Sequence, residues 1–217
     1  MDPELLNKFQ AILDNRQNKK AVERFKITQF DEATIREMLM RCYQSNVIQR
    51  RIEFINDEST QRNVSKAAKW LTGDYKVGLI LYGGVGNGKT TLARSICELI
   101  SILFQKDEWT GKGVVKISAL ELSKMIIDDP GRYKKIKETE LLFIDDIGTE
   151  PANVKSWGNE CSPLTELIYF RYDKQLFTLA TSNLNDAELK DRYGLRISDR
   201  FNEMFERVFF SSSSYRK

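Results

Sequence analysis

Apolar residues recur at helical spacing in the first 71 residues of the chain. They form three stripes whose members lie three or four positions apart, and residues with this spacing share one face of a helix. Polar residues at 57–60 offer N-cap side chains before the third stripe, and Gly73 is suited to end its helix. The stripes consist of Leu5, Leu6, Phe9, Ile12 and Leu13; of Ile35, Met38, Leu39, Cys42 and Tyr43; and of Val64, Ala67, Ala68 and Leu71. We therefore expect residues 1–58 to form a helical N-terminal region.

Five short apolar runs follow, at residues 77–83, 114–118, 141–146, 176–182 and 207–211. Helical stretches separate these runs, which is the pattern of successive βαβ units. The runs contain little polar alternation, and this is typical of strands that are buried on both faces. Residues 59–217 are therefore predicted to form an α/β domain, in which helices flank a five-stranded parallel sheet.

Composition narrows the class of protein further. The chain has 217 residues, of which 41% are hydrophobic, and this is enough for one principal domain with a smaller appendage. A net charge of +3 is too small to indicate a nucleic-acid or membrane partner by itself. Three cysteines and no histidine favour neither a disulfide framework nor a zinc finger. Because no apolar run approaches the ~20 residues of a membrane span, we expect a soluble, cytoplasmic protein without a membrane partner.

A phosphate-binding loop is the clearest chemical motif. Residues 83–90 read GGVGNGKT and match G-x-x-x-x-G-K-[ST], between a predicted strand and a predicted helix at 91–104. Glycines allow backbone N–H groups to surround phosphates, Lys89 would contact the β- and γ-phosphates, and the Thr90 hydroxyl would hold Mg²⁺. A glycine-rich turn that matches by chance is the alternative. We predict that ATP and Mg²⁺ bind here, through Gly83, Gly84, Val85, Gly86, Asn87, Gly88, Lys89, Thr90 and Thr91.

Two acids, Asp145 and Asp146, directly follow the apolar residues LLFI. This is a Walker B pattern, and it places both carboxylates at the carboxyl end of a strand, where open α/β sheets bind ligands. Asp145 is expected to hold Mg²⁺ through water, and Asp146 to orient or deprotonate the attacking water. Aspartate is one methylene shorter than the glutamate usual at the second position, so either the water sits closer or Glu150 helps. The alternative is a pair of surface acids that close a strand.

Polar residues in the last third of the chain complete the candidate site. Asn183 ends the predicted strand at 176–182 and is suited to hold the attacking water or to sense the γ-phosphate, although asparagine also favours turns. Arg196 and Arg200 lie four residues apart, on one face of a short predicted helix. We expect one of them to act as an arginine finger that neutralises charge at a neighbouring subunit's γ-phosphate. Two solvated or intrachain-paired arginines are the alternative.

The order of these motifs resembles the DnaC and IstB type of AAA+ ATPase, which includes bacterial replicative-helicase loaders and transposition helper ATPases. The resemblance covers roughly residues 60–217. It rests on LTELIYFRYDKQLFTLATSNL at 164–184, YGLRISDRF at 193–201 and the ending SYRK at 214–217. It implies a P-loop NTPase core with strand order 5-1-4-3-2. Because the fifth predicted strand lies close to the last residue, we expect no C-terminal lid domain.

The same resemblance implies a function in DNA replication. It assigns Asn183 to sensor 1, and it favours Arg196 over Arg200 as the finger. We expect ATP hydrolysis that assists a replicative DNA helicase, by a homo-oligomer formed on ATP or DNA binding, with residues 1–58 as the region that docks the partner. A transposase is the partner in the IstB alternative. A nucleotide-dependent adaptor with little hydrolysis and a small-molecule kinase are further alternatives.

A basic cluster lies between the second and third predicted strands. Two helical pieces are joined at residues 128–131, and the second piece carries Arg132, Lys134, Lys135 and Lys137. Lysine and arginine follow the phosphates of single-stranded DNA, and Tyr133 would add base stacking. A solvated helix face is the alternative.

Overall fold

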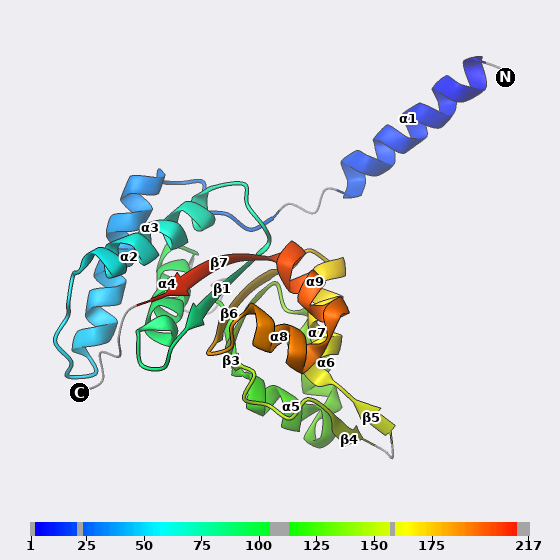
Figure 1. The fold of residues 1–217 in the computed structure, drawn as a ribbon. Coiled ribbons are helices and arrows are strands. Elements are labelled where there is room, and N and C mark those ends of the chain that lie inside the picture. Colours follow the sequence, from blue (N-terminus) through cyan, green and yellow to red (C-terminus); the bar gives the residue numbers. More distant parts are fainter. Residues whose placement is uncertain (1–2, 21–23, 105–112, 157–158, 212–217) are drawn as a thin grey trace.

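A five-stranded parallel sheet forms the centre of the fold in the computed structural model, which describes residues 3–20, 24–104, 113–156 and 159–211 (Figure 1). The sheet has the order β2-β3-β6-β1-β7, and every pair of neighbouring strands is parallel. Counted along the chain, this is the predicted order 5-1-4-3-2, so the expected fold class is confirmed. The strands are β1 (Gly78–Gly83), β2 (Val115–Ser118), β3 (Leu141–Ile147), β6 (Phe177–Ser182) and β7 (Phe205–Phe210).

Alternating side chains of the central strands enter two separate hydrophobic cores. In β1, Leu79 and Leu81 lie in one core and Ile80 lies in the other. The same division occurs in β3, where Phe143 belongs to the first core and Ile144 to the second. Because successive side chains of a strand point to opposite faces, both faces of the sheet are buried, as the unbroken apolar runs predicted.

Helices cover both faces of this sheet (Figure 1). The first core contains residues of α2 (Glu32–Ile48), α3 (Glu58–Thr72) and α4 (Lys89–Phe104). The second core contains residues of helices from the later part of the chain: α5 (Ala119–Asp128), α6 (Pro130–Glu138), α7 (Pro163–Asp173), α8 (Asp186–Tyr193) and α9 (Leu195–Met204). The protein is therefore a three-layer α/β/α structure.

The N-terminal region contains helices, but they differ in their surroundings. Helix α1 (Pro3–Lys20) extends away from the rest of the structure (Figure 1), and its apolar residues Leu5 and Phe9 are 65% and 59% exposed. Helix α2 instead buries Ile35 and Leu39 completely, in the same core as α3 and α4. A division of the chain at residue 58 stays a prediction, as does the role of residues 1–58 in partner docking.

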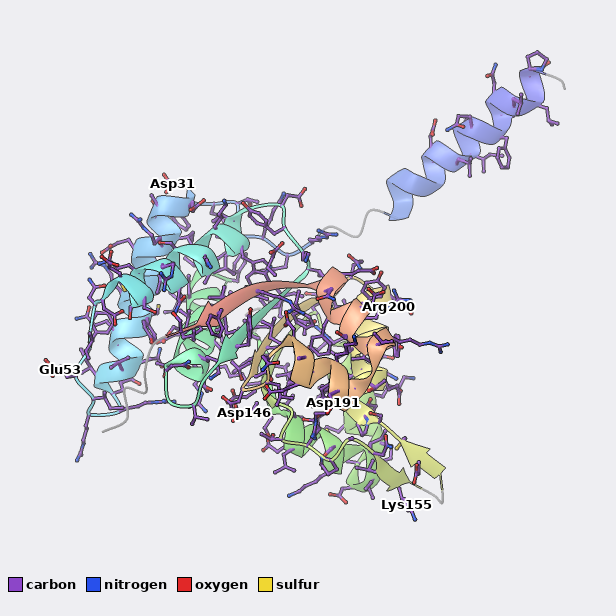
Figure 2. The ribbon with its side chains drawn as sticks, in the orientation of Figure 1. Asp31, Glu53, Asp146, Lys155, Asp191 and Arg200 are labelled. Carbon is purple, nitrogen blue, oxygen red and sulfur yellow. The ribbon has the colours of Figure 1, made fainter. Side chains whose placement is uncertain are left out.

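The segment between α1 and α2 is anchored at the edge of the sheet where the strands begin. Phe25 packs against Phe104 and Phe177, with ring centroids 5.2 Å apart in both pairs. Ile27 is buried, and its backbone N–H donates to the Leu71 carbonyl oxygen at 2.8 Å. Helix α2 then begins after its N-cap Asp31 and runs to the opposite edge of the sheet, beside the phosphate loop (Figure 2).

A small antiparallel hairpin is an element that the sequence pattern did not predict. It pairs β4 (Val154–Ser156) with β5 (Asn159–Cys161), between β3 and α7. Strands of three residues are too short to produce a recognisable alternation of apolar and polar positions. The SYRK ending at 214–217 lies outside the described residues. None of the described helices is both long enough and apolar enough to cross a membrane.

Candidate functional site

The phosphate loop connects β1 to α4 through backbone that requires glycine. Gly83, Gly86 and Gly88 have φ values of +136°, +81° and +94°, in the region that L side chains rarely adopt. Two of these positions also have no room for a side chain. A Cβ atom would lie 2.4 Å from the Phe210 carbonyl oxygen at position 83, and 2.3 Å from the Tyr43 hydroxyl at position 88. The glycines therefore allow β7 and α2 to approach the loop closely.

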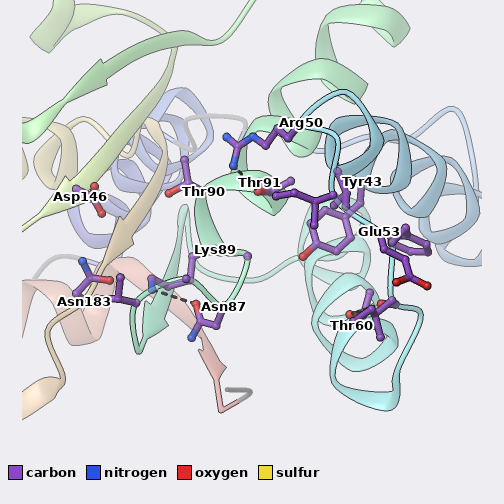
Figure 3. A pocket seen from close by; sticks show the side chains of 17 residues that line it. Tyr43, Arg50, Glu53, Thr60, Asn87, Lys89, Thr90, Thr91, Asp146 and Asn183 are labelled. Carbon is purple, nitrogen blue, oxygen red and sulfur yellow. Dashed lines mark hydrogen bonds between the residues drawn. The ribbon is translucent and has the colours of Figure 1, made fainter. Parts of the chain in front are cut away.

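Lys89 opens α4, and its side chain folds back over the loop. Its ammonium group is buried and donates to the carbonyl oxygens of Gly83 and Gly84, at 2.9 and 2.6 Å, and to Asn87 Oδ1 at 3.1 Å (Figure 3). The Asn87 amide nitrogen in turn donates to the Phe210 carbonyl oxygen at 3.0 Å. The cation is thus held at the mouth of the loop, where a phosphate oxygen can replace a carbonyl oxygen as its acceptor.

Asp145 and Thr90 meet at the carboxyl edge of the sheet. Asp145 Oδ1 accepts hydrogen bonds from the hydroxyls of Thr90, at 3.0 Å, and of Thr181, at 2.6 Å. The Arg94 guanidinium lies 4.0 Å from the other carboxylate oxygen. Mg²⁺ prefers oxygen ligands and is commonly held by one or two carboxylates together with substrate phosphates. The hydroxyl of Thr90 and the carboxylate of Asp145 fit such an ion.

Asp146 has an unusual backbone conformation. Its φ of +56° is left-handed, which costs a residue other than glycine about 1–3 kcal/mol. Two threonines hold this turn, because the Asp146 N–H donates to Thr181 Oγ1 at 2.8 Å and the Thr149 hydroxyl donates to the Asp146 carbonyl oxygen at 2.8 Å. As a result, the Asp146 side chain faces the same pocket as Lys89 and Thr90 (Figure 3).

One pocket contains most of the predicted nucleotide-binding residues. The phosphate loop and the start of α4 form one wall, and Asp146 and Asn183 lie at one end (Figure 3). The C-terminal half of α2 and the segment that follows it form the opposite wall, which contributes Tyr43, Val47, Arg50, Ile52, Glu53, Phe54, Ile55 and Thr60. The α2 wall therefore gives the pocket a largely apolar half that also contains Arg50 and Glu53, and the other half contains Lys89 and Asp146.

The wall from α2 and the role of Thr181 were not among the sequence-based predictions. Arg50 Nη1 donates to Thr91 Oγ1 at 3.2 Å, although the two residues are 41 positions apart. No motif marks this wall, and the only signal is the apolar character of residues 52–55 just before the N-cap Asp57. Thr181 reaches Asp145 because β3 and β6 are parallel neighbours, with Ile144 beside Ala180. Only the pairing register reveals that contact.

Glu150 does not lie in the pocket. Its side chain is 2% exposed and accepts hydrogen bonds from the Gly148 N–H, at 2.9 Å, and from the Tyr193 hydroxyl, while Arg192 lies 4.0 Å away. Burial and the hydrogen bond to Glu150 raise the pKa of Tyr193. The expectation that Glu150 helps to activate water is therefore not supported, because its carboxylate is buried and already hydrogen-bonded to Gly148 and Tyr193.

The two arginines of α9 have different environments, and neither lines the pocket of its own chain. Arg200 is stacked over the Tyr172 ring at 4.5 Å, and its Nη1 atom donates to Glu203 Oε2 at 3.4 Å. In Figure 2, Arg200 lies well away from Asp146. Arg196 is exposed and has no hydrogen-bond or ion-pair partner within residues 3–20, 24–104, 113–156 and 159–211. Of these two arginines, Arg196 is thus the one whose guanidinium has no partner among the described residues.

The basic cluster on α6 is partly engaged by the protein itself. Arg132, Lys134 and Lys135 are exposed, whereas Lys137 forms an ion pair with Glu166 and lies over the rings of Tyr133 and Phe170. The expectation that Tyr133 stacks on a base is wrong. Its ring is 4% exposed and its hydroxyl donates to the Pro163 carbonyl oxygen at 2.8 Å, so the side chain belongs to the core.

Comparisons with known proteins agree with this architecture. The family model described as "ATPase family associated with various cellular activities (AAA)" matches residues 79–207. The search of curated protein sequences found no match. Among solved structures, the DnaC helicase loader is 21% identical, with a TM-score of 0.57 over 79% of this chain and 99% of that one.

Two further structures show similar agreement. DnaI is 19% identical, with a TM-score of 0.55 over 85% of this chain and 96% of that one. A putative primosome component from Streptococcus pyogenes serotype M3 is 20% identical, with a TM-score of 0.53 over 88% of this chain and 95% of that one. At these identities the similarity establishes a common fold.

Proposed function

Because the chain belongs to the AAA family of ATPases, we propose that it binds ATP with Mg²⁺ and hydrolyses the bond between the β- and γ-phosphates. One observation carries this proposal. Lys89, the Thr90–Asp145 hydroxyl–carboxylate pair and the strained Asp146 converge at the carboxyl edge of the sheet. A cation, a metal-binding pair and a candidate base at one place are the groups that phosphoryl transfer to water requires.

Each residue of the candidate site has a separate role in the proposed hydrolysis. Backbone N–H groups of the loop and the N-terminus of α4 bind the phosphates, and the Lys89 ammonium contacts the β- and γ-phosphates. Thr90 and Asp145 would hold Mg²⁺, which when bound would supply positive charge to the phosphate oxygens. Asp146 accepts a proton from water as the water oxygen bonds to the γ-phosphorus, and the bond from that phosphorus to the ADP oxygen breaks. Asn183 donates to the water or to the γ-phosphate.

We propose that the site is completed by a second copy of the chain. Arg196 is exposed, lacks a partner among the described residues and lies outside the pocket of its own chain. A guanidinium that reaches the γ-phosphate of a neighbouring subunit would stabilise transition-state charge, and such fingers increase rates by about 10³–10⁵-fold. Hydrolysis therefore requires a homo-oligomer, formed when ATP or DNA binds.

The proposed biological role is to assist a replicative DNA helicase. It is supported by a fold in common with structures described as a helicase loader and a primosome component, and by the exposed apolar face of α1 as a docking element. Single-stranded DNA is proposed to contact Arg132, Lys134 and Lys135 on α6, with Lys137 in a supporting position. A transposition helper of the IstB type, with a transposase as partner, is the second candidate because the motif order fits both.

Measurement of phosphate release from ATP tests the proposed ATPase activity. We expect slow release by the protein alone and faster release with single-stranded DNA or with a replicative helicase, which should also co-purify with the protein. The Asp146→Asn variant should bind ATP but release little phosphate, because an amide cannot accept the proton. ATP binding without any release under all these conditions would indicate a nucleotide-dependent adaptor. Transfer of the γ-phosphate to a metabolite would indicate a kinase.

A further inference from the structure

Arg50 projects into the nucleotide pocket from the wall opposite the phosphate loop. It follows α2 directly, and its guanidinium reaches the start of α4 (Figure 3). There, Nη1 donates to the Thr91 hydroxyl oxygen at 3.2 Å. The Arg50 side chain is exposed on the pocket side, so a bound ligand can contact its remaining N–H groups.

The electrostatics around Arg50 favour an anion. The N-terminus of a helix carries partial positive charge, and the Lys89 ammonium lies in the same pocket. No carboxylate lies within ion-pair distance of Arg50 in the part of the chain that the structure describes, and the acids that line the pocket are Glu53 and Asp146. Figure 3 shows the Glu53 carboxylate directed away from Arg50. Two cations and a helix N-terminus therefore surround a space that an anion can fill.

We infer that Arg50 binds the α-phosphate of the nucleotide. Lys89 lies over the phosphate loop, where it would contact the β- and γ-phosphates. Thr90 is hydrogen-bonded to Asp145, where Mg²⁺ would bind. Thr91 lies one residue further into α4, toward the half of the pocket formed by Tyr43, Phe54 and Ile55. That apolar half suits the nucleoside, so the phosphate next to Thr91 and Arg50 is the one attached to the nucleoside.

This assignment adds to the proposed function, on which it rests. Arg50 lies outside residues 79–207, so the match to the family model does not supply it. The α-phosphate is common to ATP and ADP, and a guanidinium binds phosphate oxygens through charge-assisted hydrogen bonds. Arg50 should therefore increase affinity for both nucleotides by a similar factor, unlike a residue that senses the γ-phosphate.

Equilibrium binding of ATP and ADP by the full chain tests the inference, with Arg50→Gln compared with Arg51→Gln. Arg51 is the adjacent exposed arginine and does not line the pocket, so its variant is the matched control. We expect Arg50→Gln to weaken ATP and ADP to a similar extent, by roughly 10- to 100-fold, as for loss of a hydrogen bond to a charged group. Arg50→Lys should recover part of this loss, and thermal unfolding of each variant reports folding.

The outcomes separate this inference from the proposed function. Wild-type protein that binds neither nucleotide would overturn both. Wild-type binding together with unchanged affinity in Arg50→Gln would overturn the role of Arg50 alone. A loss of ATP affinity with unchanged ADP affinity would place Arg50 at the γ-phosphate and contradict the assignment to the α-phosphate.

Discussion

The Thr181 hydroxyl holds both acids of the proposed catalytic site, and its removal gives the sharpest prediction. It donates to Asp145 Oδ1 at 2.6 Å and accepts from the Asp146 N–H at 2.8 Å. Valine has nearly the same shape as threonine but lacks the hydroxyl. Thr181→Val therefore removes two hydrogen bonds from a fully buried position without creating a large cavity.

The magnitude follows from these contacts. A hydrogen bond to a charged acceptor contributes about 1.5–3 kcal/mol, and a buried N–H without a partner costs about 1–3 kcal/mol. Asp145 keeps its bond from Thr90 at 3.0 Å, so we expect a net destabilisation of about 2–4 kcal/mol rather than the full sum. In a chain of this size, 1 kcal/mol lowers Tm by about 2–4 °C, so Tm should fall by about 4–16 °C.

Turnover should fall as well, because the left-handed turn at Asp146 loses one of its two threonine partners. Release of backbone strain worth about 1–3 kcal/mol corresponds to a loss of roughly 5- to 160-fold in kcat. Denaturant unfolding gives the change in the free energy of unfolding, and phosphate release at saturating ATP gives kcat. Thr181→Ser keeps the hydroxyl and is the matched control. If Thr181→Val equals Thr181→Ser in both measurements, the hydroxyl does not organise the acid pair.

Three further predictions concern single contacts of the proposed site. Lys89→Ala should abolish ATP binding, measured with a fluorescent analogue, because the loop loses its buried cation; normal affinity would contradict the phosphate-loop assignment. Arg196→Ala should bind ATP normally but hydrolyse it slowly at protein concentrations that support oligomers, whereas Arg200→Ala should retain hydrolysis; equal rates in the two variants would refute the finger. Replacement of three exposed residues of α6 by alanine should reduce the slope of log affinity for single-stranded DNA against log salt by about 2, at about 0.7 per phosphate contact. The α6 residues to be replaced are Arg132, Lys134 and Lys135. The control replaces three exposed basic residues of α3, Arg62, Lys66 and Lys69, and should leave the slope unchanged. An unchanged slope in the α6 variant would exclude α6 as a DNA-binding surface.

Local patterns in the sequence were sufficient to predict the α/β fold class and the five strands of the main sheet. Buried strands such as residues 141–147 are continuous apolar runs, and residues 83–90 contain a complete motif in its structural context. The candidate residues that lie within such a motif, Lys89 and Thr90, could therefore be named without a structure, although their roles stay predictions. The resemblance to a family then supplied the strand order, which composition and periodicity do not determine.

Contacts between distant segments could not be predicted in the same way. Arg50 meets Thr91 only because α2 packs on α4, and no local pattern encodes that packing. The error at Tyr133 has a simpler cause. Tyr133 and Ile136 are three residues apart and share the buried face of α6, so the helical period already indicated that the ring belongs to the core.

Gly83 shows that a ligand-binding motif can also be a requirement of the scaffold. Its φ is +136°, and a Cβ atom there would lie 2.4 Å from the Phe210 carbonyl oxygen at the end of β7. Any side chain at this position would separate the outermost strand from its neighbour before a nucleotide arrived. Loss of activity on replacing Gly83 would therefore be ambiguous between misassembly and weakened affinity, and a chain that had abandoned ATP altogether would still need glycine here.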